Sequence, residues 1–196
     1  SSDVCSSDLE MAQYEVAYAR RRLARVRPED DPQAVYVQGD ARELAHPPGS
    51  LDAVTFWNVI EHIDRYESVL AAAARMLRPG GSVYIICPNY AAFRQEAHYL
   101  VPWYPFLPRR LGSAWLRRHG RDPGYFENEI FYRSNWGVLR ALGRCGFEPF
   151  DFLNGMSMRI GRPNLRRMLR SFRSFADYYN PLRESVVLAA RRKAVP

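Results

Sequence analysis

Three polar residues that could do chemistry, Asn58, Glu61 and His62, follow the apolar run Leu51–Trp57. Such a run predicts a strand buried on both faces of a parallel sheet, and ligands of α/β sheets bind beyond the carboxyl ends of strands. A histidine there could take a proton from a hydroxyl group, because imidazole titrates near neutrality. We predict His62, with Glu61, as the catalytic pair. The alternative is a histidine that is hydrogen-bonded near a helix start for structural reasons only.

Two carboxylates follow other predicted strands. Glu10 precedes a predicted helix, and a carboxylate in that place can accept two hydrogen bonds from a ribose diol. A glutamate favoured by the helix dipole is the alternative. Asp40 follows the β-rich run Val35–Gln38, within a Gly-Asp-Ala sequence that is also common as a plain turn. Both carboxylates are therefore candidate ligand contacts.

The order of the predicted elements indicates an α/β sheet. Apolar and β-rich runs predict strands, and runs with helical periodicity end at proline or glycine. Strands separated by helices of this length imply right-handed βαβ units. The predicted strands are 35–38, 51–57, 82–87, 147–153 and 185–190, and the predicted helices are 11–25, 66–77 and 135–144.

The run Leu51–His62, followed by Leu77–Asn89 with its Pro-Gly-Gly sequence, resembles class I methyltransferases that use S-adenosylmethionine. The resemblance extends over Glu10–Arg192 and implies a Rossmann-like sheet with helices on both faces. It also implies that Glu10 binds the ribose and Asp40 the adenine amino group of the cofactor. The cofactor-binding residues that the resemblance implies are Glu10, Met11, Asp40, Ala41, Trp57 and Asn58.

The sequence departs from the family pattern in two places. The family's first strand and its Gly-x-Gly-x-Gly loop are absent, so we expect an α/β sheet without that strand and weak cofactor binding by this chain alone. Asn58 stands where some relatives carry the first glutamate of Glu-x-x-Glu-His. That change removes a hard ligand, and no metal is expected.

The first nine residues differ from the rest of the chain. Ser1-Ser-Asp-Val is nearly repeated by Ser6-Ser-Asp-Leu, without helical or strand periodicity. We expect residues 1–9 to be a disordered tail or a sequence artefact. Residues 10–196 are expected to form one methyltransferase-like domain, which the length and apolar content allow.

Aromatic residues and prolines gather in residues 89–130, an expected insertion between a strand and the next helix. Members of the family carry substrate-recognition elements there, and an aromatic lid over a ring-containing substrate would have this composition. We predict that Trp103, Tyr104 and Tyr125 contact the substrate. The alternatives are a membrane-surface patch, which would give peripheral membrane contact, and a helix packed on the sheet.

The charge, the cysteines and the apolar runs of the chain limit the partners and the cellular location that we expect for it. The net charge is +7, but the arginines are spread along the chain, and the arginine-containing stretch 159–173 is compatible with a solvated helix. We therefore expect no nucleic-acid partner. Three cysteines without metal or redox spacing, and no apolar run of membrane-span length, indicate a cytoplasmic protein.

These observations predict an S-adenosylmethionine-dependent methyltransferase that O-methylates a small-molecule or lipid- or glycan-type acceptor. A nicotinamide dehydrogenase would require Gly-x-Gly-x-x-Gly at its first helix, which the sequence lacks. A catalytically inactive binding or partner subunit with the same fold is the stronger alternative. The sequence does not indicate an oligomeric state.

Overall fold

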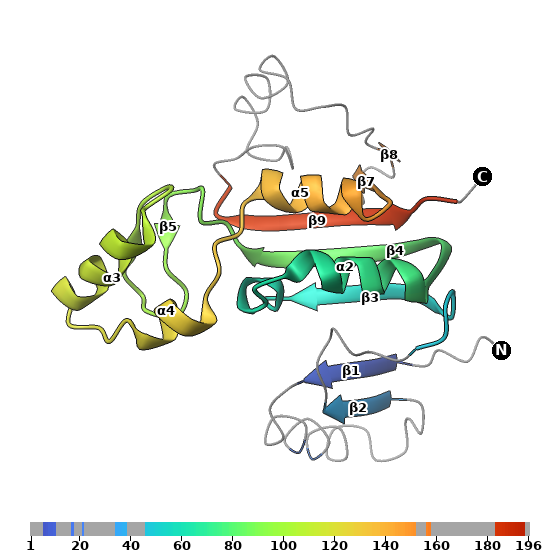
Figure 1. Cartoon of the computed structure of the whole chain (residues 1–196), viewed down its shortest axis with the longest axis horizontal. Coiled ribbons are helices and arrows are strands. Elements are labelled where there is room, and N and C mark those ends of the chain that lie inside the picture. Colours follow the sequence, from blue (N-terminus) through green and yellow to red (C-terminus); the bar gives the residue numbers. More distant parts are fainter. Residues whose placement is uncertain are drawn as a thin grey trace. The chain divides into compact units, whose positions relative to one another are not determined.

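The computed structural model describes residues 6–10, 17, 21, 34–38, 46–151, 156–157 and 183–194. The chain divides into two compact units, Ser1–His46 and Pro47–Pro196 (Figure 1), and each is described by itself. Among the described residues, no helix is long and apolar enough to cross a membrane.

The first unit contains a parallel pair of strands. β1 (Ser6–Glu10) pairs with β2 (Ala34–Gln38), so that Glu10 lies opposite Gln38 at the carboxyl ends of both. The serine-rich stretch before Glu10 thus forms a strand although its side chains show no strand periodicity, because parallel pairing satisfies backbone groups whatever the side chains are. Of the helix expected at 11–25, the structure describes Ala17 and Arg21, and both are helical.

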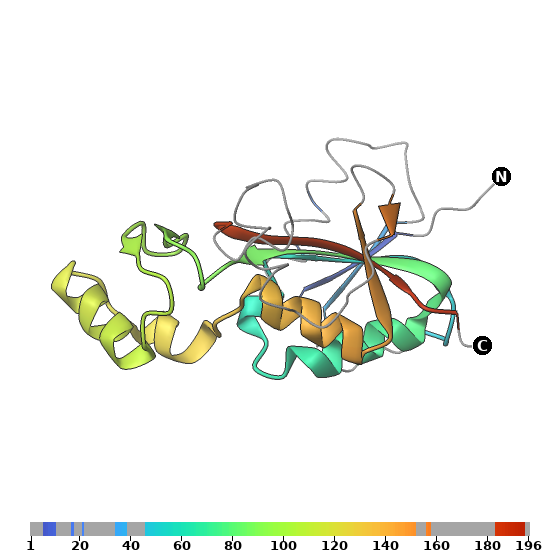
Figure 2. The same cartoon turned by 90° about the horizontal axis from the view of Figure 1, so that it is seen from above.

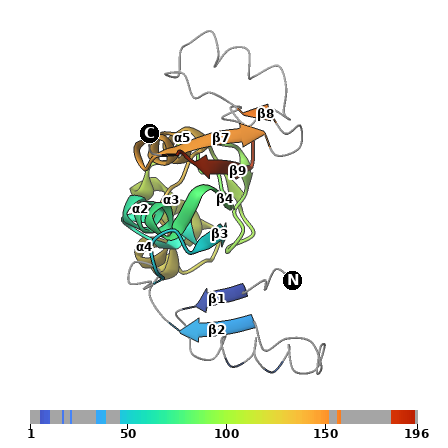
Figure 3. The same ribbon diagram turned by 90° about the vertical axis from the view of Figure 1, so that its right-hand side faces the viewer.

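The second unit contains a mixed five-stranded sheet with the order β3-β4-β9-β7-β8 (Figure 3). β3 is parallel to β4, whereas β9 is antiparallel to both β4 and β7, and β7 is antiparallel to β8. The strands are β3 (Leu51–Trp57), β4 (Leu77–Pro88), β7 (Phe147–Asp151), β8 (Met156–Ser157) and β9 (Ser185–Arg192). The α/β class expected from the sequence is confirmed.

Two helices, α2 (Tyr66–Met76) and α5 (Asn135–Arg144), lie on the same face of this sheet (Figure 2). Alternate residues of β4 are buried, as expected for a strand with one face under helices. α5 begins at the N-cap Ser134, whose hydroxyl oxygen accepts from the backbone N–H of Gly137, and the left-handed Gly146 follows its end. The stretch 159–173, expected to be helical, lies outside the described residues.

β3 differs from the expected strand buried on both faces. Of its residues only Phe56 is buried, and Leu51 and Val54 are half-buried. Among the described residues, β3 pairs with β4 alone at the edge of the five-stranded sheet, and the helices α2 and α5 lie on one face of that sheet only (Figure 2). An apolar run by itself therefore does not place a strand at the centre of a sheet.

The Pro-Gly-Gly turn forms a bulge within β4. The register moves from Leu51 opposite Leu77 to Ala53 opposite Ser82, so three extra residues of β4 are accommodated in between. Gly80 adopts a φ of +77°, which favours glycine. A side chain on Gly81 would meet a backbone carbonyl oxygen at 2.9 Å. The predicted turn is thus present, and its glycines are required sterically.

The insertion, residues 89–130, projects beyond the carboxyl ends of β3 and β4 (Figure 1). It contains β5 (Arg94–Gln95), β6 (Pro102–Trp103), α3 (Arg109–Arg118) and α4 (Gly124–Glu129), and β5 pairs with β6. It has a core of its own, formed by Tyr90, Val101, Trp103, Leu116, Phe126 and Ile130. Gly112 of α3 is part of that close packing, because a side chain there would meet Trp103 at 2.9 Å and Phe126 at 3.1 Å.

Candidate active site

A tight turn follows the carboxyl end of β3 and leads into the short 3-10 helix η1 (Ile60–His62). Asn58 adopts a φ of +51°, in the left-handed region that asparagine tolerates better than most residues. Its N–H donates to the carbonyl oxygen of Ile86 on β4 at 2.8 Å. Trp57, at the strand's end, is 61% exposed and its ring contacts that of Tyr84. The turn thus leaves both predicted cofactor contacts at the surface.

The backbone of η1 is fixed by the segment that follows the insertion. The N–H of Phe131 donates to the carbonyl oxygen of Glu61 at 2.7 Å. Arg133, which is buried, donates from Nε to the carbonyl oxygen of Ile60 at 2.9 Å and also hydrogen-bonds that of Ile63. Its guanidinium lies over the ring of Tyr66. A single buried arginine therefore holds the turn that carries His62.

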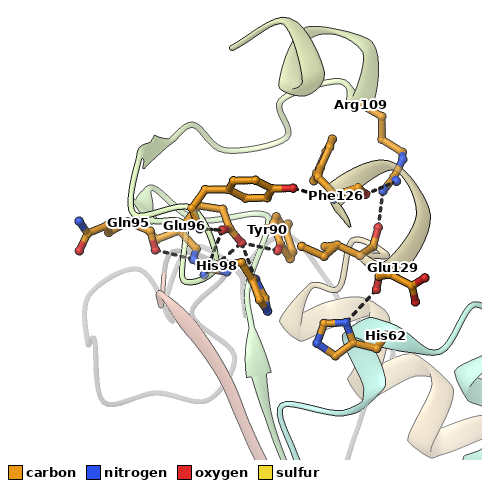
Figure 4. Close-up of polar contacts among 11 residues, drawn as sticks. His62, Tyr90, Gln95, Glu96, His98, Arg109, Phe126 and Glu129 are labelled. Carbon is orange, nitrogen blue, oxygen red and sulfur yellow. Dashed lines mark hydrogen bonds and ion pairs between the residues drawn. The ribbon is translucent and has the colours of Figure 1, made fainter. Parts of the chain in front are cut away.

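His62 is oriented by the end of α4. Its Nδ1 lies 2.8 Å from the carbonyl oxygen of Glu129 (Figure 4). Because a carbonyl oxygen can only accept, Nδ1 carries the hydrogen in this contact, and in the neutral ring Nε2 is the nitrogen with a free lone pair. This is the tautomer that a base with Nε2 facing a substrate requires.

Glu61, the other predicted catalytic residue, is completely buried. Within the described part of the chain neither of its carboxyl oxygens has a hydrogen-bond partner. Burial raises the pKa of Glu61 to about 7, although the charges of His98, Arg133 and Arg94 act in the opposite direction. Glu61 is thus placed to affect the charge near His62, and it is enclosed too deeply to touch a substrate directly.

Two rings from the insertion lie against His62. The ring centroids of His62 and His98 are 5.4 Å apart in an edge-to-face arrangement, and Tyr125 lies 5.9 Å from His62 and 5.4 Å from His98. Tyr125 is 47% exposed, so this group of rings is open to solvent. Burial raises the pKa of the Tyr125 hydroxyl, and nearby carboxylates add to the effect. The fold thus brings the predicted base and one predicted substrate residue together.

His98 has a carboxylate partner that the sequence interpretation missed. Its Nδ1 lies 3.1 Å from Oε1 of Glu96, which is completely buried. The same carboxylate accepts from the Tyr90 hydroxyl at 2.8 Å and from the N–H groups of His98 and Tyr99 at 2.7 and 2.9 Å (Figure 4). Burial alone would raise the pKa of Glu96, but the hydrogen bonds from His98 and Tyr90 outweigh it and lower the pKa to about 2. Glu96 is therefore ionised at neutral pH.

The other predicted site residues lie in different surroundings, and some of them lie outside the described part of the chain. Trp103, expected to contact a substrate, is instead fully buried in the core of the insertion, where its ring packs on those of Tyr90 and Phe126. Tyr104 is 47% exposed and remains accessible. The structure describes Glu10 at the end of β1. Met11, Asp40 and Ala41 lie outside the described residues.

The structure adds Arg133, Glu96 and His98 to the predicted site. The Glu-x-His spacing in the insertion is the sequence feature from which Glu96 and His98 could have been predicted. In the part of the chain that the structure describes, no three histidine, cysteine, aspartate or glutamate side chains gather in a way that could hold a metal ion.

Residues 3–85 match the protein family described as a methyltransferase domain. The 27-O-demethylrifamycin SV methyltransferase of Amycolatopsis mediterranei is 28% identical over 98% of this chain and 70% of its own length. A solved S-adenosylmethionine-dependent methyltransferase from Mesorhizobium loti superposes with a TM-score of 0.56 at 17% identity, over 95% of this chain and 80% of that one. By these comparisons the chain is similar to a methyltransferase domain over residues 3–85, and its fold is similar to that of a solved S-adenosylmethionine-dependent methyltransferase.

Relatives with higher identity match shorter segments of this chain. A Mycobacterium tuberculosis protein is 38% identical over 44% of this chain and 29% of its own length. The chain spans about a third of the length of the first curated relatives that it matches. The solved structures establish the fold, which agrees with the mixed sheet of the second unit.

Proposed function

We propose that this protein transfers a methyl group from S-adenosylmethionine to a hydroxyl group of a small-molecule or lipid- or glycan-type acceptor. The observation that carries the proposal is the orientation of His62, whose Nδ1 is engaged by the carbonyl oxygen of Glu129. The free Nε2 of the neutral ring is then available to accept a hydroxyl proton.

The described strand ends are compatible with this cofactor. In the first unit, Glu10 ends β1 and lies opposite Gln38, after which the chain continues into Gly39-Asp40. A carboxylate at such a strand end would accept hydrogen bonds from the ribose. When bound, the cofactor supplies a methyl group on a positively charged sulfur. The fit rests on the position of Glu10 at a strand end, and the contacts themselves are part of the proposal.

The chain's own contribution would be to orient the acceptor and to remove its proton. Positioning a hydroxyl group next to an electrophile supplies much of the rate enhancement in direct displacement. His62 would take the hydroxyl proton at Nε2 while the oxygen of the acceptor's hydroxyl group is methylated. The carbonyl oxygen of Glu129 would keep the His62 ring in one tautomer. The exposed rings of Tyr104 and Tyr125 would contact the apolar part of the acceptor.

Two observations support an oxygen acceptor on a small molecule. The exposed ring of Tyr125, from the insertion, lies beside the imidazole of His62, which can accept a hydroxyl proton. The Amycolatopsis relative, which aligns over nearly the whole chain, is named as a methyltransferase of 27-O-demethylrifamycin SV.

The test compares His62→Gln with His119→Gln in a methyl-transfer assay. The purified protein is given labelled S-adenosylmethionine at saturating concentration and a panel of phenols, alcohols and sugar alcohols. His119 is the matched control, because its Nδ1 also lies 2.8 Å from a backbone carbonyl oxygen, but on the exposed end of α3. We expect His62→Gln to lower kcat by roughly a hundredfold or more and His119→Gln to leave it unchanged. Equal activity of the two variants would exclude His62 as the base.

Cofactor binding is tested separately by calorimetry with S-adenosylhomocysteine. Glu10→Gln should weaken binding by about tenfold, because a charge-assisted hydrogen bond contributes about 1.5–3 kcal/mol. Glu67→Gln, on the exposed side of α2, serves as control. Binding without methyl transfer to any acceptor would favour the inactive partner subunit.

A further inference from the structure

Glu96 and His98 form a carboxylate–imidazole pair beside the predicted base. Glu96 is completely buried, whereas 25% of the His98 side chain is exposed. The carboxylate thus lies behind the ring, and the ring lies between the carboxylate and solvent. This order from the interior outwards is the one expected of a dyad that presents a base to a ligand.

The pair is rigid because the carboxylate is held from several directions. Oε1 accepts from the Tyr90 hydroxyl and from Nδ1 of His98, and Oε2 accepts from two backbone N–H groups. Arg94, also buried, brings a guanidinium nitrogen to 3.9 Å from Oε1. A carboxylate with this many donors has little freedom to turn, so the plane of the His98 ring is fixed with it.

The contact with Glu96 also selects the tautomer of His98. An ionised carboxylate accepts only, so Nδ1 carries the hydrogen and Nε2 has the free lone pair in the neutral ring. His62 has the same tautomer by its contact with Glu129. Figure 4 shows the two rings near each other, with Nε2 of His62 on the side that faces His98. The two imidazoles therefore lie next to each other, each with the lone pair on Nε2 in its neutral form.

The two rings differ in the partner that would balance a positive charge. Behind His62 is a neutral carbonyl group, and behind His98 is a carboxylate that is ionised at neutral pH. A charged hydrogen-bond partner is roughly twice as effective as a neutral one. His98 is thus the ring of this pair that has a charged partner behind it.

We propose that His98 is a second catalytic base of the acceptor site and that Glu96 is its positioning residue. In this step the O–H bond of the acceptor breaks, its one proton bonds to Nε2 of His62 and passes directly or through one water to Nε2 of His98, and the electron pair stays on the oxygen that receives the methyl group. His62 therefore takes the proton from the hydroxyl group, and His98 takes it from His62. The inference rests on the proposed function and deepens it.

The test measures kcat and KM for His98→Gln, Glu96→Gln and the double variant, with an acceptor from the panel above. We expect each single variant to lower kcat by about a hundredfold, at least as much as His62→Gln, with KM little changed. The double variant should be no worse than His98→Gln, because Glu96 acts only through His98. Glu127→Gln is the control for Glu96, since this exposed glutamate of α4 pairs with Arg117 rather than with a histidine, and it should retain activity.

A spectroscopic measurement keeps the proposal independent of variant folding. Nitrogen-15 NMR of the imidazoles should show His98 protonated at Nδ1 in the wild-type protein and lose that signature in Glu96→Gln. Protonation of neutral His98 at Nε2 would overturn the dyad. Full activity of His98→Gln beside inactive His62→Gln would overturn the role of His98 and leave the proposed function standing. A wild-type protein that methylates no acceptor while binding S-adenosylhomocysteine would overturn both.

Discussion

The buried carboxyl group of Glu61 should make the stability of the second unit depend on pH. Burial raises its pKa from the ordinary 4.5 to about 7, and both oxygens lack a hydrogen-bond partner among the described residues. In the unfolded chain the same group is exposed and titrates near its ordinary value. The folded state therefore holds the Glu61 proton more tightly than the unfolded state does.

The sign and size of the effect follow from proton linkage. Between pH 4.5 and pH 7 the folded state binds more protons at this group than the unfolded state, so the free energy of unfolding falls as the pH rises. Above about pH 8 the group is largely ionised in both states and contributes little further slope. Each pKa unit corresponds to about 1.4 kcal/mol, so the change from 4.5 to about 7 corresponds to a loss of about 3 kcal/mol.

The prediction is checked by urea unfolding of wild type, Glu61→Gln and Glu67→Gln at pH 4, 5, 6, 7 and 8, values that span this window. The glutamine has no ionisable proton, so Glu61→Gln should lack the decrease of about 3 kcal/mol between the acidic and basic ends. Comparing the slopes, rather than absolute stabilities, removes the constant cost of burying an amide. Glu67, an exposed glutamate in the first turn of α2, is the matched control. The free energy of unfolding of Glu67→Gln should depend on pH as that of wild type does.

The result that would refute the reasoning is a pH dependence that Glu61→Gln shares with wild type. It would mean that the carboxyl group is solvated or paired in solution and titrates near its ordinary value. A decrease that persists above pH 8 would equally assign the effect to another group.

Three further variants test the packing that positions the site. Arg133→Met should lower the stability of the second unit by about 2–4 kcal/mol, because it leaves buried carbonyl groups without donors, whereas Arg140→Met on the exposed side of α5 should have little effect in the same urea titration. Gly112→Ala should cost about 1–3 kcal/mol in thermal unfolding through overpacking of the insertion core, and Gly124→Ala, where a side chain meets its nearest atoms at 3.5 Å, should be tolerated. Ser134→Ala should cost about 1 kcal/mol by removing the N-cap of α5, which hydrogen exchange of the helix's first turn would report.

Elements with strong local signals could be predicted from the sequence. The helix 135–144 has a capping serine before it and a glycine after it, and its bounds agree with the structure. Local chemistry decides both ends, so no tertiary information is needed there. β3 shows the opposite case: its bounds agree, but its burial does not, since burial depends on which strands pair with it. The domain boundaries predicted from the sequence remain a prediction.

The candidate site was predictable only in part, because it combines residues distant in sequence. His62 stands at a recognisable strand end, whereas Glu96 and His98 lie in a segment without strand or helix periodicity. Trp103 shows the same limit, because aromatic composition does not distinguish a ring in the core of the insertion from one that faces a ligand. Tyr125 reaches His62 only once the insertion has folded.

The core of the insertion explains how a segment with little regular structure can hold a precise arrangement of rings. Its buried aromatic cluster needs no contribution from the sheet, so the geometry of Glu96 and His98 is set within the insertion itself. The hydrogen bonds from Phe131 and Arg133 to η1, and from His62 to Glu129, then join this preformed part to the end of β3. Because the two histidines come from separately stabilised parts, a change at this junction should alter their spacing without unfolding either. Arg133 is therefore the residue through which the geometry of the site can be altered from a distance.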